Sequence, residues 1–303
     1  MPETQATMTV PTRLGPISYR VIGNGPVTVL AVHGLLFDGR LWDGVAQRLA
    51  TRATVILPDF PFGAHRTAVP DRSKLTPLTV AAAFVDVLDA LSVPTAVLLG
   101  NDTGGALAQI AASLAPERFT ALALTSSDAF TEFPPTLFKP VAKFSHLPGV
   151  TRALLWAFSR APLLARPGLL NLLARSPVDP ALVKDWLRPA STDRAVRDDL
   201  IAWMRSLDSR YTLEAAEKLR SYPGSAILAW SRQDRLFPAS YAERLVALLP
   251  KARLVWIDDA LTLSPLDQPG AVAEAVLSLL DELVVPAVAT TAPPSLERPV
   301  ANA

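Results

Sequence analysis

The sequence predicts an α/β fold in which a mostly parallel central sheet carries helices on both faces. Short β-branched runs alternate with helix-like stretches along much of the chain, and the strand-like runs are almost entirely apolar. Successive strand–helix–strand units build parallel sheets, and strands covered on both faces are apolar along their length. A third observation, a helical block that interrupts the alternation, predicts an inserted lid.

The alternation assigns each element in turn. The expected strands are 27–34, 53–60, 95–102, 120–128, 225–231 and 252–259. The expected helices of the sheet-forming part are 40–50, 78–91, 104–115, 240–249 and 271–283.

Between these two series the chain has a helical character, many Pro and Arg residues and no strand-like run. We therefore expect a core formed by 1–129 and 212–285, a helical cap or lid over 130–211, and a disordered Pro/Ala/Thr-rich tail over 286–303. Such an insertion usually lies over the carboxyl ends of the strands, where these sheets place their sites. The alternative is a packed helical layer with no gating role.

Composition excludes several classes of function. The chain has 303 residues, 29 basic and 28 acidic residues without long charged runs, and no cysteine. Nucleic-acid binding needs clustered Lys and Arg, and disulfides, thiolate catalysis and Cys-based metal sites need cysteine. The N-terminus lacks the apolar stretch of a signal peptide, and no apolar run approaches the ~20 residues that span a bilayer. We expect a cytoplasmic protein with a small-molecule substrate, no nucleic-acid or membrane partner, no cofactor and no metal; the composition leaves the oligomeric state open.

The most specific motif is Gly100-Asn101-Asp102-Thr103-Gly104, where a predicted strand ends and a helix begins. It fits the Gly-x-nucleophile-x-Gly pattern, which requires this context. Side chains at the flanking glycines would clash with neighbouring elements, and Gly105 lets the helix approach the sheet. The alternative is an ordinary turn with a capping aspartate.

Together with AVHGLL at 31–36, PDFPFG at 58–63 and WSRQD at 230–234, this motif resembles the α/β-hydrolase superfamily over about residues 10–285. The most similar branch has an aspartate nucleophile and contains haloalkane dehalogenases and epoxide hydrolases.

The resemblance implies a two-step reaction. Asp102 would attack an sp³ carbon and form an alkyl ester, because a carboxylate is already ionised at neutral pH. A base would then activate the water that hydrolyses this ester. The family's geometry implies an oxyanion hole from the N–H groups of Thr103 and Leu35. Asp234 and Asp128 occupy the family's two acid positions, although either one could be a capping or loop residue.

The family's catalytic histidine is missing. Aligning on Asp267-Gln268-Pro269 places Thr262 there, and the histidines are His33, His65 and His146. His65 is the candidate substitute base, with a backbone-bonded loop histidine as the alternative. We expect His33, Leu36, Trp156 and Thr262 to border the substrate pocket, with His33 shaping its loop rather than reacting.

Two departures leave the substrate open. Haloalkane dehalogenases usually have Trp and Asn where this chain has Thr103 and Leu35, and epoxide hydrolases use two lid tyrosines where only Tyr211 borders this lid. The leading hypothesis is a hydrolase of a small, largely apolar substrate with Asp102 as nucleophile and a non-standard base. The alternatives are a catalytically degenerate binding protein, or a lyase or transferase on the same scaffold.

Overall fold

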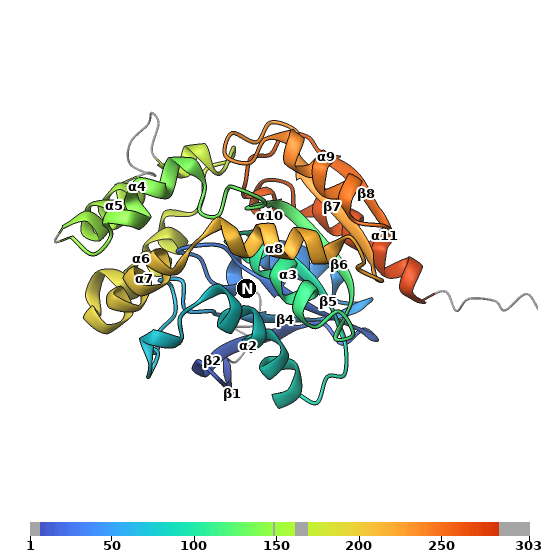
Figure 1. The fold of residues 1–303 in the computed structure, drawn as a ribbon, viewed down its shortest axis with the longest axis horizontal. Helices are drawn as coiled ribbons and strands as arrows, with labels where there is room; N and C mark the ends of the chain where they lie inside the picture. The colour runs from blue at the N-terminus through green and yellow to red at the C-terminus, as the bar shows by residue number, and fades with distance from the viewer. Residues whose placement is uncertain (1–6, 148, 161–168, 285–303) are drawn as a thin grey trace, which may run out of the picture.

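The structure, a computed structural model, describes residues 7–147, 149–160 and 169–284. The predicted tail over 286–303 lies outside these ranges. Figure 1 shows a central twisted sheet with helices packed on its two faces and a group of helices beside it.

The described residues form one eight-stranded sheet with the order β1-β2-β4-β3-β5-β6-β7-β8. Its strands are β1 (Met8–Thr12), β2 (Gly15–Ile22), β3 (Val27–Val32), β4 (Ala53–Pro58), β5 (Ala96–Asp102), β6 (Phe119–Ser127), β7 (Ser225–Ser231) and β8 (Ala252–Ile257). The pairs β1–β2 and β2–β4 are antiparallel, and every other pair is parallel. The predicted mostly parallel sheet is therefore confirmed. Each predicted strand overlaps an observed one, and only β6 extends beyond its prediction, beginning one residue before the expected 120–128.

Helices cover both faces of the sheet because the central strands are apolar on both. In β5, Val97 and Leu99 belong to one buried cluster and Leu98 to another. The first face carries α1 (Asp43–Leu49) and α11 (Pro269–Val284), which contact each other. The second carries α2 (Pro77–Ala90), α3 (Thr103–Leu114), α8 (Ser209–Leu219) and α9 (Ala239–Leu248). Short elements connect them: η1 (Gly39–Trp42), η2 (Arg72–Lys74) and α10 (Ser264–Asp267).

The regular elements in the described part of the segment between β6 and α8 are all helices. It contains η3 (Thr136–Phe138), α4 (Lys139–Phe144), α5 (Val150–Arg160), η4 (Leu169–Leu172), α6 (Pro180–Thr192) and α7 (Arg194–Ser206). We call this segment the cap; Figure 1 shows α4 to α7 together on one side of the sheet. The expected core boundary at residue 212 falls inside α8, which begins at Ser209 and packs against α3. Among the described helices, none combines the length and apolar character needed to cross a membrane.

Candidate active site

Asp102 stands on a sharp turn between the last residue of β5 and the first turn of α3. Its φ of 53° lies in the left-handed region, which a residue with a side chain adopts at a cost of about 1–3 kcal/mol. Glycine is required around it. A Cβ on Gly100 would lie 2.6 Å from the Cα of Gly105, one on Gly104 would lie 2.3 Å from a β3 carbonyl oxygen, and one on Gly105 would lie 2.3 Å from a β6 side chain. The steric reason that the sequence gives for these glycines is confirmed.

The turn after β3, at Gly34 and Leu35, packs against the Asp102 carboxylate. The Leu35 N–H donates to Asp102 Oδ2 at 3.1 Å. A Cβ on Gly34 would lie 2.1 Å from the same oxygen, so only glycine allows this approach. The Thr103 N–H also favours the ionised carboxylate. The two expected donors of the oxyanion hole therefore both lie beside Asp102.

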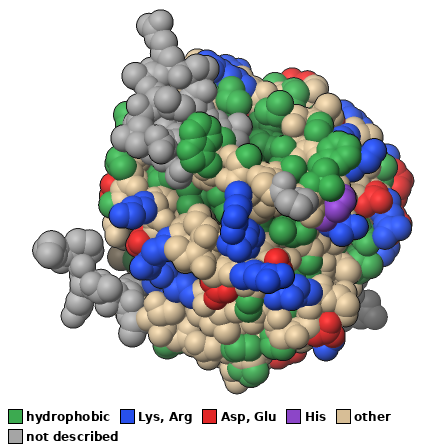
Figure 2. Space-filling model, turned by 90° about the vertical axis from the view of Figure 1, so that its left-hand side faces the viewer, with side chains coloured by type: hydrophobic (Ala, Val, Ile, Leu, Met, Phe, Trp, Pro, Cys, Tyr) green, Lys and Arg blue, Asp and Glu red, His purple; other side chains and the backbone are tan. Residues whose placement is uncertain are grey.

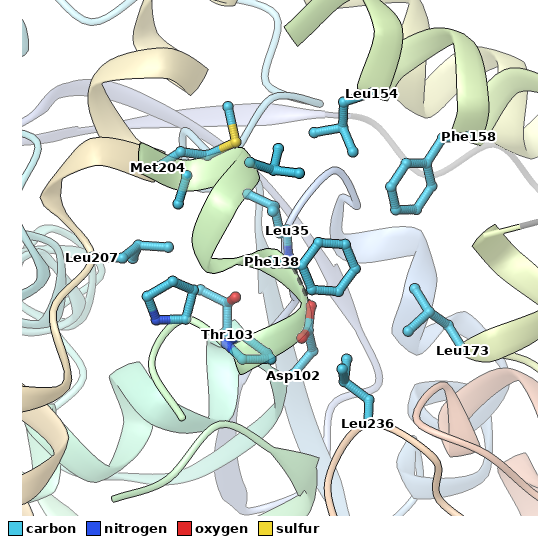
Figure 3. A pocket seen from close by; sticks show the side chains of 14 residues that line it. Leu35, Asp102, Thr103, Phe138, Leu154, Phe158, Leu173, Met204, Leu207 and Leu236 are labelled. Atoms are coloured by element: carbon cyan, nitrogen blue, oxygen red, sulfur yellow. Dashed lines mark hydrogen bonds between the residues drawn. The ribbon is translucent and has the colours of Figure 1, made fainter. Parts of the chain in front are cut away.

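Asp102 forms the polar end of an apolar cavity between the cap and the core. Figure 3 shows its carboxylate below a ring of apolar side chains from the cap and the core. Asp102 and Thr103 are its polar side chains. The other lining residues are Leu35, Pro134, Pro135, Phe138, Val141, Ala142, Leu154, Phe158, Leu173, Met204, Leu207 and Leu236.

Burial raises the pKa of Asp102 to about 7. The N–H groups of Leu35 and Thr103 oppose this rise by stabilising the anion, and the negative charge of Asp234 adds to it. Near neutral pH the carboxylate therefore divides between its neutral and ionised forms.

Asp128 follows β6 directly and is fully buried. Neither of its carboxyl oxygens has a hydrogen-bond partner in the described part of the chain. Burial, and then the charge of Asp102, raise its pKa well above the usual value. The nearby Thr103 hydroxyl lowers the pKa of Asp128 somewhat, although it makes no hydrogen bond of normal geometry to either carboxyl oxygen. Burial therefore favours the neutral form of Asp128, which does not line the cavity.

The side chains of Asp234 and Thr262 contact each other near Asp102. The Thr262 hydroxyl donates to Asp234 Oδ1 at 3.1 Å, and the N–H groups of Leu236 and Phe237 donate to the same oxygen at 2.7 Å each. Asp234 Oδ2 has no hydrogen-bond partner among the described residues. Burial raises the pKa of Asp234, although its hydrogen bonds oppose the rise. Thr262 is thus placed beside the acid, as the alignment expects for the missing histidine.

The lining of this cavity does not include the expected border residues His33, Leu36, Trp156 and Thr262. His33 is buried; its Nδ1–H donates to the Gly34 carbonyl at 2.9 Å and its Nε2 accepts from the Phe60 N–H at 3.0 Å. Burial lowers its pKa to about 4, so it is neutral and shapes its loop. Leu36 is buried elsewhere in the core, and Trp156 lies on the outside of α5.

His65 lies away from the cavity at Asp102. Its Nε2 is 3.3 Å from Asp199 Oδ2 on α7, and its Nδ1 accepts from the Gly63 N–H at 3.3 Å. Asp199 also accepts from the Val69 N–H and the Arg72 guanidinium. The structure therefore places His65 between a core loop and the cap, and not among the cavity residues. His146 is exposed after α4 and does not line the cavity either.

Asn101 is a residue that the sequence analysis does not single out, although it stands inside the quoted motif. Its amide Nδ2 donates to the Thr262 carbonyl at 2.7 Å and to the Thr125 hydroxyl at 2.7 Å. It therefore ties β5 to the loop that holds Thr262. Its place next to Asp102 is the signal that could have identified it.

A family model described as the alpha/beta hydrolase fold matches residues 27–269. The chain belongs to the α/β-hydrolase fold family. The uncharacterized hydrolase YugF of Bacillus subtilis is 26% identical over 263 residues, which cover 84% of this chain and 90% of that protein. An epoxide hydrolase of Caballeronia sordidicola is 35% identical over 101 residues, covering 33% of this chain and 30% of that one.

A solved structure of an ancestral haloalkane dehalogenase has a TM-score of 0.75 at 19% identity and covers 91% of this chain and 99% of its own. This similarity concerns the fold. Within this α/β-hydrolase, the described ranges contain no cluster of three or more His, Asp or Glu side chains arranged to hold a metal ion.

Proposed function

We propose that this protein is a hydrolase in which the Asp102 carboxylate attacks a small, largely apolar substrate. One observation carries the proposal: Asp102 is the ionisable side chain of an otherwise apolar cavity and sits on the strand–turn–helix corner with an N–H donor on its carboxylate. Largely apolar cavities with a few convergent polar groups and a perturbed pKa are typical substrate sites.

The first step fits an electrophilic sp³ carbon. An ionised Asp102 oxygen forms a bond to that carbon as the bond to the leaving group breaks, which gives an alkyl ester. A halide departs as the anion, whereas an epoxide oxygen stays on the neighbouring carbon as an alkoxide and takes a proton from water. Epoxides and alkyl halides are such electrophiles, and proteins of both substrate classes are among the relatives. The Leu35 N–H is placed to donate to the carbonyl oxygen of the ester.

The second step needs a base, and Asp234 supports this role better than His65 does. Neither residue lines the cavity. Asp234 Oδ2 is buried without a hydrogen bond of normal geometry in the described residues, with the Ser126 hydroxyl near the carboxyl, whereas both nitrogens of His65 already face partners. The charge of Asp234 also acts on Asp102, so the two carboxyls are close. In this step water gives a proton to Asp234 while the water oxygen adds to the ester carbonyl. The bond from the carbonyl carbon to the alcohol oxygen then breaks, this oxygen takes the proton back from Asp234, and the alcohol leaves as the Asp102 carboxyl is restored.

Intact-mass measurement with panels of epoxides, alkyl halides and esters tests the proposal. We expect an adduct on the wild-type chain, no adduct on Asp102→Asn, and a longer-lived adduct on Asp234→Asn. His65→Ala should leave adduct decay unchanged. Asp258→Asn, at an exposed carboxylate after β8, is the matched control and should behave like wild type. Absence of both adduct and turnover with every compound would contradict the proposal.

A second candidate function is ligand binding without turnover. The observation that favours it is that no histidine lines the cavity in the described part of the chain, and burial favours the neutral form of Asp128. In that case an apolar ligand should raise the melting temperature of wild type and of Asp102→Asn to a similar extent, with no adduct on either.

A further inference from the structure

The first half of the cap, residues 133–178, has a charge distribution unlike that of the remaining chain. No Asp or Glu stands between Glu132 and Asp179, whereas this stretch contains Lys139, Lys143, Arg152, Arg160, Arg166 and Arg175. The rest of the chain holds the other 23 basic residues and all 28 acidic ones. A nearly neutral protein thus carries a segment with only positive charge.

The same segment exposes large apolar side chains. Leu137, Phe144, Leu147 and Trp156 are 57%, 44%, 44% and 57% exposed, and they make up half of the exposed large hydrophobic side chains of the described residues. Lys143 and Arg152 stand among them in the sequence and are exposed as well. We call these six residues the cap patch. Figure 2 shows hydrophobic side chains together with Lys and Arg on this side of the molecule.

The helices that carry most of the cap patch, η3, α4 and α5, also present apolar side chains to the interior. Phe138, Val141, Leu154 and Phe158 belong to the same η3, α4 and α5 elements, and they line the cavity above Asp102. The inner side chains therefore line the cavity, while the outer apolar side chains are exposed. In Figure 1, α4 and α5 lie at the edge of the molecule, away from the sheet.

We propose that the cap patch binds the surface of a bilayer that contains anionic lipids. Exposed Trp, Phe and Leu side chains beside Lys and Arg are typical of protein segments that lie in the membrane interface. The apolar side chains enter the boundary of the acyl chains, and the cations are attracted to anionic headgroups. The expectation of no membrane partner depends on the lack of a spanning run, which does not bear on binding at the surface.

Charge argues against a second copy of this chain as the occupant. A two-fold symmetric contact would bring Lys143 and Arg152 of both copies together with no acidic residue of the segment to pair with them. Like charges placed opposite each other oppose association. A bilayer is also a source of apolar molecules, and the cap patch is on the elements that line the cavity. The proposal does not depend on the reaction assigned to Asp102.

Sedimentation of the full chain with vesicles tests this proposal. We expect binding to phosphatidylcholine vesicles that contain 30% phosphatidylglycerol, weaker binding to pure phosphatidylcholine, and loss of the difference in high salt. Each cation near an anionic surface contributes roughly a fivefold change in affinity, so Lys143→Gln with Arg152→Gln should weaken binding about 30-fold. The charge-matched control, Lys218→Gln with Lys251→Gln on the core, should bind like wild type.

The apolar half of the cap patch has its own test. Phe144→Ser with Leu147→Ser should weaken binding to both kinds of vesicle, because the lost contact does not depend on headgroup charge. Circular dichroism and the urea denaturation midpoint check that the variants fold. The proposal is overturned if wild type binds neither vesicle, if the core control loses binding equally, or if wild type is a dimer in ultracentrifugation that Phe144→Ser with Leu147→Ser dissociates.

Discussion

Two opposing effects determine the pKa of the Asp102 carboxyl group. Burial at the end of an apolar cavity disfavours the anion, while the N–H groups of Leu35 and Thr103 favour it. The result is a pKa of about 7. A carboxylate with few compensating charges is poorly stabilised before reaction, and conversion to a neutral ester removes that cost. The same burial that raises the pKa therefore favours the chemistry proposed for this residue.

The pH dependence of adduct formation follows from this pKa. Only the ionised carboxylate attacks, so the rate of adduct formation should rise with pH through about 7 and reach a plateau above pH 8. Asp234→Asn should move the midpoint to lower pH because the charge of Asp234 contributes to the raised pKa. Intact mass against time between pH 5 and 9 measures both. A rate that is flat across this range would exclude Asp102 as the titrating nucleophile.

Thr262 provides a test of the missing base. Its hydroxyl lies 3.1 Å from Asp234 Oδ1 and its side chain is buried, so a histidine here would stand beside the acid. A positioned base contributes roughly 10²–10⁴-fold to proton transfer. We expect Thr262→His to speed decay of the Asp102 adduct at least about tenfold. Thr262→Val, which removes the hydroxyl but supplies no base, is the control and should not speed it.

At the scale of elements, two buried carboxylates join the cap to the core. Asp199 of α7 accepts from His65, the Val69 N–H and Arg72. Asp38, before η1, accepts from the indole N–H of Trp186 on α6 at 2.9 Å. These contacts give His65 a structural role that the chain pattern alone could not show, since its partner is 134 residues away.

Asp199→Asn should loosen the attachment of α7. Burial opposes ionisation of Asp199, but hydrogen bonds from His65, Val69 and Arg72 outweigh it and lower the pKa. Removing one partner of a buried pair typically costs 3–5 kcal/mol, and because Arg72 is partly exposed we expect about 1–3 kcal/mol in the free energy of unfolding. Urea denaturation measures the loss. Asp198→Asn, at the neighbouring and more exposed position, should change stability by less than about 0.5 kcal/mol.

For the whole molecule, the sequence predicts the parts of the fold that repeat a local pattern. The apolar strands from β3 to β8 and the turn at Asp102 carry signals within a few residues of themselves. The pair β1 and β2 is antiparallel at the sheet edge and lies outside the strand–helix alternation, so that alternation does not place it.

The site is less predictable than the fold because the residues that form it come from segments far apart in the sequence. The motif places Asp102 and the alignment places Thr262, but the cavity walls are cap side chains such as Phe138, Leu154 and Met204. Their pattern indicates only buried helix faces. Likewise Trp156 is a large aromatic residue of the kind expected in a pocket, but its side chain is exposed on α5. Which face of a cap helix meets the core depends on tertiary packing.

The buried carboxyls also determine how the stability of the whole protein varies with pH. The folded-state pKa of Asp102 is about 7 against 3.8 in the unfolded chain, so the folded state holds the extra proton between these values. The contribution of Asp102 to the free energy of unfolding is therefore full below pH 4. It is lost as pH rises through about 7, and its size is on the order of 4 kcal/mol. Asp102→Asn cannot ionise. Urea denaturation should therefore show wild type falling relative to Asp102→Asn from pH 4.5 to 8, whereas Asp281→Asn, at an exposed carboxylate, should run parallel to wild type. Parallel curves for wild type and Asp102→Asn would mean that Asp102 is ionised throughout.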